Sequence, residues 1–507
     1  MMRAAALPWF ARHEARLAWR DWLAMVQGGR RRRKAVVALA VALFVIFLHL
    51  LAYGLLQSHA DALATGKRAF VALTGAMFLS WTLILSQAME SVTRSFYARA
   101  DLDLLLSSPS PAAAIFKVRL VSIALGTAAM SMLFLGPVIN ALVLLGGWRF
   151  LSAYGVLAAM ACSATGAAAC LVALLFRAIG PRATRLASQI VAAIIGAAFV
   201  IGVQVVAIMA YGGMSRFTVL QSPELLAAAP AIDSGMWTLA RAAMGDLGAM
   251  VVVLAASVAF LAGVVALISG EFARYSLATV GQSGGASAST ARRPAFRKRS
   301  VAQTLRRKEW ILLARDPWLL SQSLMQVLYL APPALLLWRN FGGDGGALVI
   351  LAPVLVMAAG QLAGGLAWLA ISGEDAPDLV ATAPVSARAL LGAKIQAVMV
   401  AVAAPLAPLI AALAFASPWI AIVTAIGAAC ACGCATAIQI FFRSQARRAA
   451  FRRRQTSSRL ATMFEALASI SVAGAAGLAA AGSWGAVAPA ICALAVVAAA
   501  RALSSGR

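Results

Sequence analysis

The chain has 507 residues, of which 62% are apolar and 12% are charged, and its formal net charge is +26. A soluble domain is about half apolar and about a quarter charged, so this composition excludes an ordinary soluble protein. Because the apolar stretches lack the alternation of β-barrel strands, they predict an all-α integral membrane protein. Basic residues in such a protein gather in cytoplasmic loops, so the positive charge does not indicate nucleic-acid binding.

Twelve apolar runs approach or exceed the roughly 20 residues that cross a bilayer as a helix. The first six predicted spans cover residues 35–57, 69–89, 119–145, 150–176, 188–212 and 248–270. The other six cover residues 319–338, 346–370, 395–416, 418–442, 461–482 and 485–503. A segment rich in Gly, Ser and Ala at 282–290 separates the two sets, so we expect two six-span halves joined by a flexible linker.

The basic residues favour one orientation in the membrane. With both termini in the cytoplasm, 37 of the 43 Lys and Arg residues fall on the inner side, and the six on the outer side are Lys67, Arg68, Arg149, Arg216, Arg241 and Arg339. The acidic residues divide twelve inside and five outside, so the bias is specific to Lys and Arg. This positive-inside pattern supports cytoplasmic termini and an even number of spans.

We therefore expect four parts in chain order. They are a cytoplasmic amphipathic helix at 1–34, the first half at 35–270, a basic cytoplasmic linker with a second short helix at 271–318, and the second half at 319–507. In the first part, Trp19 and Trp22 share one helical face and Arg16 and Arg20 another, which suits a helix lying on membrane lipid.

Three pairs of short motifs occur in the same order in the two halves, which indicates an internal repeat. After the second span of each half, the matched residues lie 275 positions apart: Asp103-Leu104, Ser107, Pro109 and Arg119 against Asp378-Leu379, Thr382, Pro384 and Lys394. The other two pairs are Glu14 with Arg20-Asp21 against Glu309 with Arg315-Asp316, and Phe176-Arg177 with Arg185 against Phe442-Arg443 with Arg459. Because each half has an even number of spans, the halves are expected to be parallel repeats.

The motif after the second span of each half combines apolar and acidic side chains. Acidic residues are scarce in this chain, yet five of the twelve expected on the inner side lie here: Asp101, Asp103, Glu374, Asp375 and Asp378. Apolar and acidic groups exposed together indicate a docking surface for another protein. A proline then ends each short helix.

At these motifs the chain resembles the permease subunits of bacterial ATP-binding-cassette exporters, type-two export class, in a form with two fused halves. The resemblance is carried by Lys308-Glu309-Trp310 through Arg315-Asp316-Pro317, by Asp101–Pro111 and by Gly373–Pro384. It implies a multi-pass protein of the bacterial inner membrane that moves substrate outward by alternating access. It also implies that the driving ATPase is a separate cytosolic subunit, present in two copies.

The resemblance further implies roles for particular residues. The connecting helices, Glu14–Val26 and Lys308–Trp318, would include Glu14, Arg20, Asp21, Glu309, Arg315 and Asp316. The coupling helices that seat on the ATPase would include Asp101, Asp103, Leu104, Ser107, Pro109, Glu374, Asp375, Asp378, Leu379, Thr382 and Pro384. Second cytoplasmic contacts would lie at Arg177–Arg185 and Arg443–Arg459.

The longest external loop, Gly213–Leu247, precedes the sixth span, where the family has a re-entrant hairpin. Its segment Ser222–Met244 is expected to be either a short helical hairpin in the outer leaflet or a plain loop. The matching loop of the second half, around Ser483-Trp484, has almost no room for such a hairpin. We therefore expect the two halves to differ at their outer ends.

The chain has no ATP-binding motif of its own, because its single Gly-Lys pair, Gly66-Lys67, is followed by Arg68 and has no glycine five residues before it. We expect no catalytic, cofactor or metal site in this chain, and ATP hydrolysis in a partner. The alternative left open is an ion-coupled secondary transporter, which usually buries charged groups at mid-membrane. Glu90 and Glu465 lie at span ends, and His49, the one deep titratable side chain, is explained equally well by an interhelical hydrogen bond.

Overall fold

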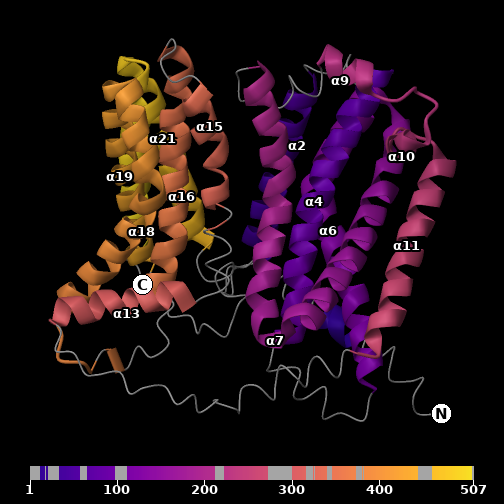
Figure 1. Ribbon diagram of the computed structural model, residues 1–507, viewed down its shortest axis with the longest axis horizontal. Coiled ribbons are helices and arrows are strands. Elements are labelled where there is room, and N and C mark those ends of the chain that lie inside the picture. The colour runs from indigo at the N-terminus through magenta and orange to yellow at the C-terminus, as the bar shows by residue number, and fades with distance from the viewer. Residues whose placement is uncertain are drawn as a thin grey trace. The chain divides into compact units, whose positions relative to one another are not determined.

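A computed structural model describes residues 12–17, 19–20, 34–57, 66–97, 111–211, 222–271, 300–315, 324, 326–339, 345–372, 379–380, 382–442 and 459–504 (Figure 1). All regular elements in these residues are helices. Ten of them are long and apolar enough to cross a membrane: Lys67–Tyr97, Ala113–Gly146, Trp148–Pro181, Ala183–Met209, Leu247–Ser269, Leu348–Ile371, Ala387–Ala416, Pro418–Phe441, Ala461–Ala480 and Trp484–Ser504. The predicted all-helical class is confirmed for these residues, and the helices fit a multi-pass membrane protein.

The described residues form two compact units, which are treated separately below. The first draws on residues 12–200 and 222–271, and the second on residues 201–211 and 300–504. The main helices up to residue 271 are α2 (Lys34–Gln57), α4 (Lys67–Tyr97), α6 (Ala112–Gly146), α7 (Ser152–Tyr211) and α11 (Leu247–Ser269). Those after residue 300 are α13 (Val301–Arg315), α15 (Ala331–Arg339), α16 (Leu351–Ser372), α18 (Ala387–Ala416), α19 (Pro418–Phe441), α21 (Arg459–Ala480) and α22 (Val487–Ser504).

The ten spanning helices correspond to ten of the twelve predicted spans. The predicted span 35–57 coincides with α2, within which Val45–Gln57 is described as a shorter apolar helix. The predicted span 319–338 is described only in part, and its last portion is the nine-residue helix α15. The count of twelve and the division into two six-span repeats therefore stay predictions.

Two helices continue well past the apolar runs that predicted them. α4 ends at Tyr97, eight residues after the predicted boundary, and α6 begins at Ala112, seven residues before it. The extensions carry Arg94, Lys117 and Arg119, which end the apolar runs without ending the helices, because Lys and Arg are good helix formers. The predicted boundaries were wrong here, and these helix ends carry charge beyond the apolar zone.

α7 contains a sharp turn between its two spanning arms, Trp148–Pro181 and Ala183–Met209. At the turn, Gly180 has φ of 71° and ψ of 170°, a backbone conformation open essentially only to glycine. Pro181 follows, and its fixed φ suits the start of the second arm. The Tyr97 hydroxyl donates a 2.6 Å hydrogen bond to the Pro181 carbonyl, which ties this turn to the end of α4.

The core of the first unit lies where α4 and α6 pack against the first arm of α7. Met89 and Phe96 of α4 and Phe116 of α6 are among its fully buried side chains. The Phe96 ring centroid lies 5.6 Å from that of Phe116 and 5.0 Å from that of Phe176 in α7. This aromatic cluster fixes the ends of the three helices at the side expected to face the cytoplasm.

In the second unit, α16 packs closely against α21 through two glycines one helical turn apart. A Cβ atom built on Gly360 would lie 2.3 Å from Oγ of Ser469, and one built on Gly364 would lie 2.6 Å from a carboxylate oxygen of Glu465. Small residues at this spacing let two membrane helices approach closely. The polar side chains opposite them need partners in apolar surroundings, and Gln439 of α19 donates a hydrogen bond to Glu465.

The predicted hairpin Ser222–Met244 is helical, and the plain loop is wrong. It consists of α9 (Pro223–Ala228), η2 (Gly235–Trp237) and α10 (Thr238–Ala243). The Trp237 ring stacks on Phe70 of α4 with centroids 5.8 Å apart, which fastens the hairpin to the bundle. In the second unit, only the short turn η4 (Trp484–Ala486) joins α21 to α22, as the loop length predicted.

Candidate functional site

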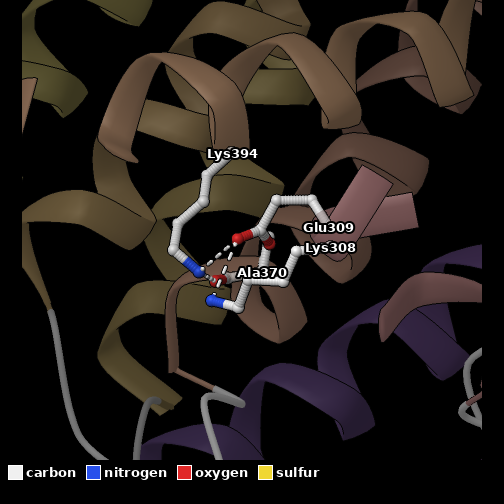
Figure 2. A network of polar contacts seen from close by, with 4 residues as sticks. All are labelled: Lys308, Glu309, Ala370 and Lys394. Atoms are coloured by element: carbon white, nitrogen blue, oxygen red, sulfur yellow. Dashed lines mark hydrogen bonds and ion pairs between the residues drawn. The ribbon is translucent and has the colours of Figure 1, made fainter. Parts of the chain in front are cut away.

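In the second unit, one buried glutamate joins three helices (Figure 2). The side chain of Glu309 in α13 is 0% exposed, and its Oε1 lies 3.1 Å from Nζ of Lys394 in α18. The Lys394 side chain is 7% exposed and also donates to the backbone carbonyl of Ala370 near the end of α16. The ammonium group of Lys308 lies 3.5 Å from the same Glu309 oxygen. α13, α18 and the end of α16 are therefore held together by ionic and hydrogen-bonded contacts.

α13 lies across the ends of α16 and α18 rather than along them (Figure 1). It begins with a capping box: the Ser300 hydroxyl accepts from the backbone N–H of Gln303 at 3.3 Å, and the Gln303 side chain accepts from the Ser300 N–H at 3.3 Å. The helix buries Glu309 and Leu313 and exposes Trp310. Its amphipathic pattern thus directs one acidic side chain inward.

The first unit contains a corresponding contact. Nε of Arg119 in α6 lies 3.7 Å from Oε1 of Glu14, and the exposed fractions of the two side chains are 10% and 19%. Nη1 of Arg119 donates a 3.2 Å hydrogen bond to the carbonyl of Ser95 near the end of α4. Here too, a glutamate that precedes the first span is joined to the start of one long helix and the end of another.

The two contacts agree in position as well as in chemistry. In each unit the cation donates to the carbonyl of the residue 24 positions earlier, Ser95 for Arg119 and Ala370 for Lys394. The surrounding helix ends and helix starts are each 275 residues apart: Tyr97 and Ser372, and Ala112 and Ala387. The offset that relates the motifs in the sequence therefore also relates these contacts.

Burial makes the Glu309 contact energetically important. Removing one partner of a buried ion pair leaves an uncompensated charge and costs about 3–5 kcal/mol. The second carboxylate oxygen of Glu309, Oε2, is buried and has no hydrogen-bond partner among the residues that the structure describes. The charge of Glu309 thus depends on the contacts of Oε1 with Lys394 and Lys308.

The predicted coupling residues are described only in part. Those outside the described residues are Asp101, Asp103, Leu104, Ser107, Pro109, Glu374, Asp375 and Asp378. Leu379, Thr382 and Pro384 are described and exposed, and the Thr382 hydroxyl donates to the Leu379 carbonyl at 3.2 Å just before α18. The described end of the second coupling segment is therefore exposed, as a docking surface requires.

The predicted connecting-helix residues behave differently from one another. Glu14 and Glu309 form the contacts above, and Arg20 is exposed. Asp21, Asp316 and the side chain of Arg315 lie outside the described residues. Of the second cytoplasmic contacts, Arg177 pairs with Glu271 at the end of α11 (3.2 Å) and stays largely exposed, whereas 443–458 is not described.

Sequence reasoning matched Arg119 with Lys394 but did not identify them as partners of the two glutamates. The available signal was a positive charge kept at the same offset near the start of a long apolar helix. The carbonyl groups of Ser95 and Ala370 also belong to the site, and no side-chain pattern could have identified them because every residue has a carbonyl.

Neither metal ligands nor a known relative identifies the site. Within the described part of the chain, no group of three or more His, Cys, Asp and Glu side chains could hold a metal ion. The six cysteines are free thiols within the long helices: Cys162, Cys170, Cys430, Cys432, Cys434 and Cys492. No protein-family model, curated protein or solved structure matches the chain. Its function is therefore inferred from the contacts described above.

Proposed function

We propose that the chain is the membrane-spanning subunit of an ATP-driven exporter in the bacterial inner membrane, which moves substrate outward by alternating access. In this proposal a separate cytosolic ATPase, present in two copies, binds the segments that follow α4 and α16. The observation that carries the proposal is the pair of buried contacts, Glu14–Arg119 and Glu309–Lys394, which lie beside those two segments.

Each contact ties together the two ends of a segment on which an ATPase would act. Residues 98–111 leave α4 shortly after Ser95 and enter α6 shortly before Arg119, and the hydrogen bond between Arg119 and Ser95 joins the two helices. Lys394 and Ala370 join the ends of residues 373–386 in the same way. A segment tied at both ends moves two helices together when it is pushed, whereas an untied loop would bend.

The glutamates extend this connection to a third element. α13 precedes the first span of the second half and is fastened by Glu309 to α18 and, through Lys394, to α16. A displacement of 373–386 would therefore move α13 with both helices, because packed helices shift as rigid bodies rather than deform. Such a movement at one end of the bundle is the input that alternating access needs.

The presence of two such contacts favours two ATPase copies, one for each half. The contact of the second unit is shorter, at 3.1 Å against 3.7 Å, and its glutamate is fully buried. Because buried charges are screened less by water and salt than exposed ones, we expect the second contact to resist disruption more strongly than the first.

An ion-coupled secondary transporter is the second candidate, and one observation favours it. Glu465 lies within α21 and accepts a hydrogen bond from Gln439 of α19. Acidic side chains inside spans often mark ion pathways. Both residues lie within two turns of helix ends, Gln439 just before Phe441 and Glu465 shortly after Arg459. This position is away from mid-membrane, so we prefer the ATP-driven exporter.

Co-purification tests the proposal directly. An affinity-tagged full chain, isolated from membranes of its own host in mild detergent, is expected to carry a soluble ATPase with it. Charge reversal at two expected docking acids, Asp103→Lys with Asp378→Lys, should abolish this association. The matched control, Asp233→Lys, changes an exposed acid in the expected external loop and should retain the ATPase. Substrate transport by the chain alone, driven only by a proton gradient, would contradict the proposal.

A further inference from the structure

A chain of hydrogen bonds joins three helices of the first unit far from the Arg119 contact. The Tyr154 hydroxyl of α7 donates to Oδ1 of Asn140 in α6 at 2.8 Å. Nδ2 of Asn140 lies 3.0 Å from Nε2 of His49 in α2, and Nδ1 of His49 lies 2.8 Å from the carbonyl oxygen of Val45. Asn140 follows Arg119 by 21 residues, which is about 30 Å along a helix. The two polar clusters thus occupy opposite ends of α6.

The groups in this chain determine where the hydrogens lie when the His49 ring is neutral. A carbonyl oxygen only accepts, so Nδ1 of His49 must carry the hydrogen that points to Val45. Nε2 then has a lone pair and accepts from the Asn140 amide nitrogen. The Asn140 oxygen in turn accepts from Tyr154. In this arrangement each of the four hydrogen-bonding groups has a suitable partner.

The same heavy atoms also accommodate a protonated ring. An imidazolium carries hydrogen on both nitrogens, so Asn140 must present its oxygen to Nε2 and its nitrogen to Tyr154. The Tyr154 hydroxyl can then accept and turn its own hydrogen to the carbonyl oxygen of Gly136, which already lies 3.3 Å away. Every group again has a partner, and the only rearrangement is a half turn of one amide.

We propose that His49 is a proton-binding site and that proton binding reverses the hydrogen bonds through Asn140 and Tyr154. A proton from solution adds to the lone pair of Nε2, and no covalent bond breaks. The other titratable or charged groups near this end of the packed helices are Tyr53 of α2 and Arg149 before α7, while α6 has none within 20 residues of Asn140. The amide oxygen, rather than a carboxylate, therefore receives the charged ring.

Packing of the helices does not require this network. α6 and α18 begin 275 residues apart, and α7 and α19 begin 266 residues apart. At these offsets Asn140 and Tyr154 correspond to Phe415 and Ile420, which are apolar. Equivalent helices of the second unit thus pack without the polar groups, although polar side chains inside spans are costly and usually functional. The site is therefore a feature of the first half alone, and it does not depend on the proposed ATPase partner.

Solid-state NMR of the full chain in phosphatidylcholine–phosphatidylglycerol bilayers tests the proposal. A His13→Gln/His59→Gln background leaves His49 as the single histidine for ¹⁵N labelling of its ring, together with labelled Asn side chains. At neutral pH we expect a protonated Nδ1, a bare Nε2 and a scalar coupling between Nε2 and the Asn140 nitrogen. On acidification both ring nitrogens should become protonated and the coupling should disappear. A protonated Nε2 at neutral pH, a ring that stays neutral on acidification, or a coupling that survives ring protonation would overturn the proposal.

Three variants separate the network from its surroundings. Asn140→Leu removes the acceptor of the charged ring and should weaken proton binding about tenfold, because hydrogen bonds to charged groups exceed neutral ones by roughly 1.4 kcal/mol. Tyr53→Phe removes a phenol of the same helix that lies outside the network and should leave proton binding unchanged. Tyr154→Phe is nearly isosteric, so it checks the network in a folded chain and should retain the neutral-state coupling. Equal proton binding by Asn140→Leu and Tyr53→Phe, or loss of the coupling in a folded Tyr154→Phe chain, would overturn the proposal.

Discussion

Replacing Lys394 by methionine would break the buried contact of the second unit while keeping an unbranched side chain. Glu309, which is 0% exposed, would retain only the ammonium group of Lys308 at 3.5 Å. The Ala370 carbonyl would also lose its side-chain donor. We therefore expect Lys394→Met to lower the free energy of unfolding by about 3–5 kcal/mol, the range for removing one partner of a buried ion pair.

Two comparison variants isolate the effect of burial. Arg94→Met breaks the ion pair with Glu90 on the same helix, whose side chains are 39% and 41% exposed, and should cost only about 0.3–0.5 kcal/mol. The double variant Lys394→Met/Glu309→Gln removes both charges and leaves no buried carboxylate. It should therefore be more stable than Lys394→Met alone, since most of the single-variant cost comes from the unpaired charge.

Reversible unfolding in mixed detergent micelles, followed by tryptophan fluorescence and circular dichroism, would measure these free energies. The chain contains 12 tryptophans, so the fluorescence signal is large. The reasoning would be refuted if Lys394→Met cost less than Arg94→Met, or if the double variant were less stable than Lys394→Met. Either result would mean that Glu309 does not depend on Lys394 for its charge compensation.

Three further substitutions test the packing of the helices. Gly364→Ala places a methyl group 2.6 Å from the Glu465 carboxylate and should cost about 1–3 kcal/mol by overpacking, whereas Gly433→Ala enters open space in α19 and should be neutral or stabilising in the same unfolding titration. Gly180→Ala forces a side chain onto a backbone with φ of 71° and should cost about 1–3 kcal/mol; an unchanged unfolding midpoint would contradict the turn geometry. Tyr97→Phe removes the hydrogen bond to the α7 turn and should cost about 1 kcal/mol, with faster hydrogen exchange confined to that turn; exchange that is unchanged there would argue against the bond.

Much of the helical frame follows from the sequence because the thickness of the bilayer fixes the length of an apolar run. The prediction 418–442 and the observed helix Pro418–Phe441 nearly coincide. Prediction failed where a helix continues into polar sequence, as α4 does to Tyr97 and α6 does from Ala112. An apolar run reports contact with lipid, whereas a helix ends only where its backbone hydrogen bonds end.

The candidate site was harder to predict than the frame. The stretch from Arg306 to Glu309 is strongly charged and resembles a solvated helix face, and the burial of Glu309 arises only because α13 lies across α16 and α18. His49 shows the opposite case. Because polar groups among apolar helices must be paired, an interhelical hydrogen bond could be expected from the sequence, and the structure supplies its partner, Asn140.

The segments that follow α4 and α16 have the same length, at 98–111 and 373–386. Loop length is usually free to change, since doubling it costs only about 0.6 kcal/mol in closure entropy. The connection between the predicted fourth and fifth spans has changed in this way, because it is a tight turn at Gly180 in the first half and spans 442–458 in the second. A partner that binds both equal segments must therefore present two sites of the same size, and inserting or deleting a residue in one segment alone would break that match.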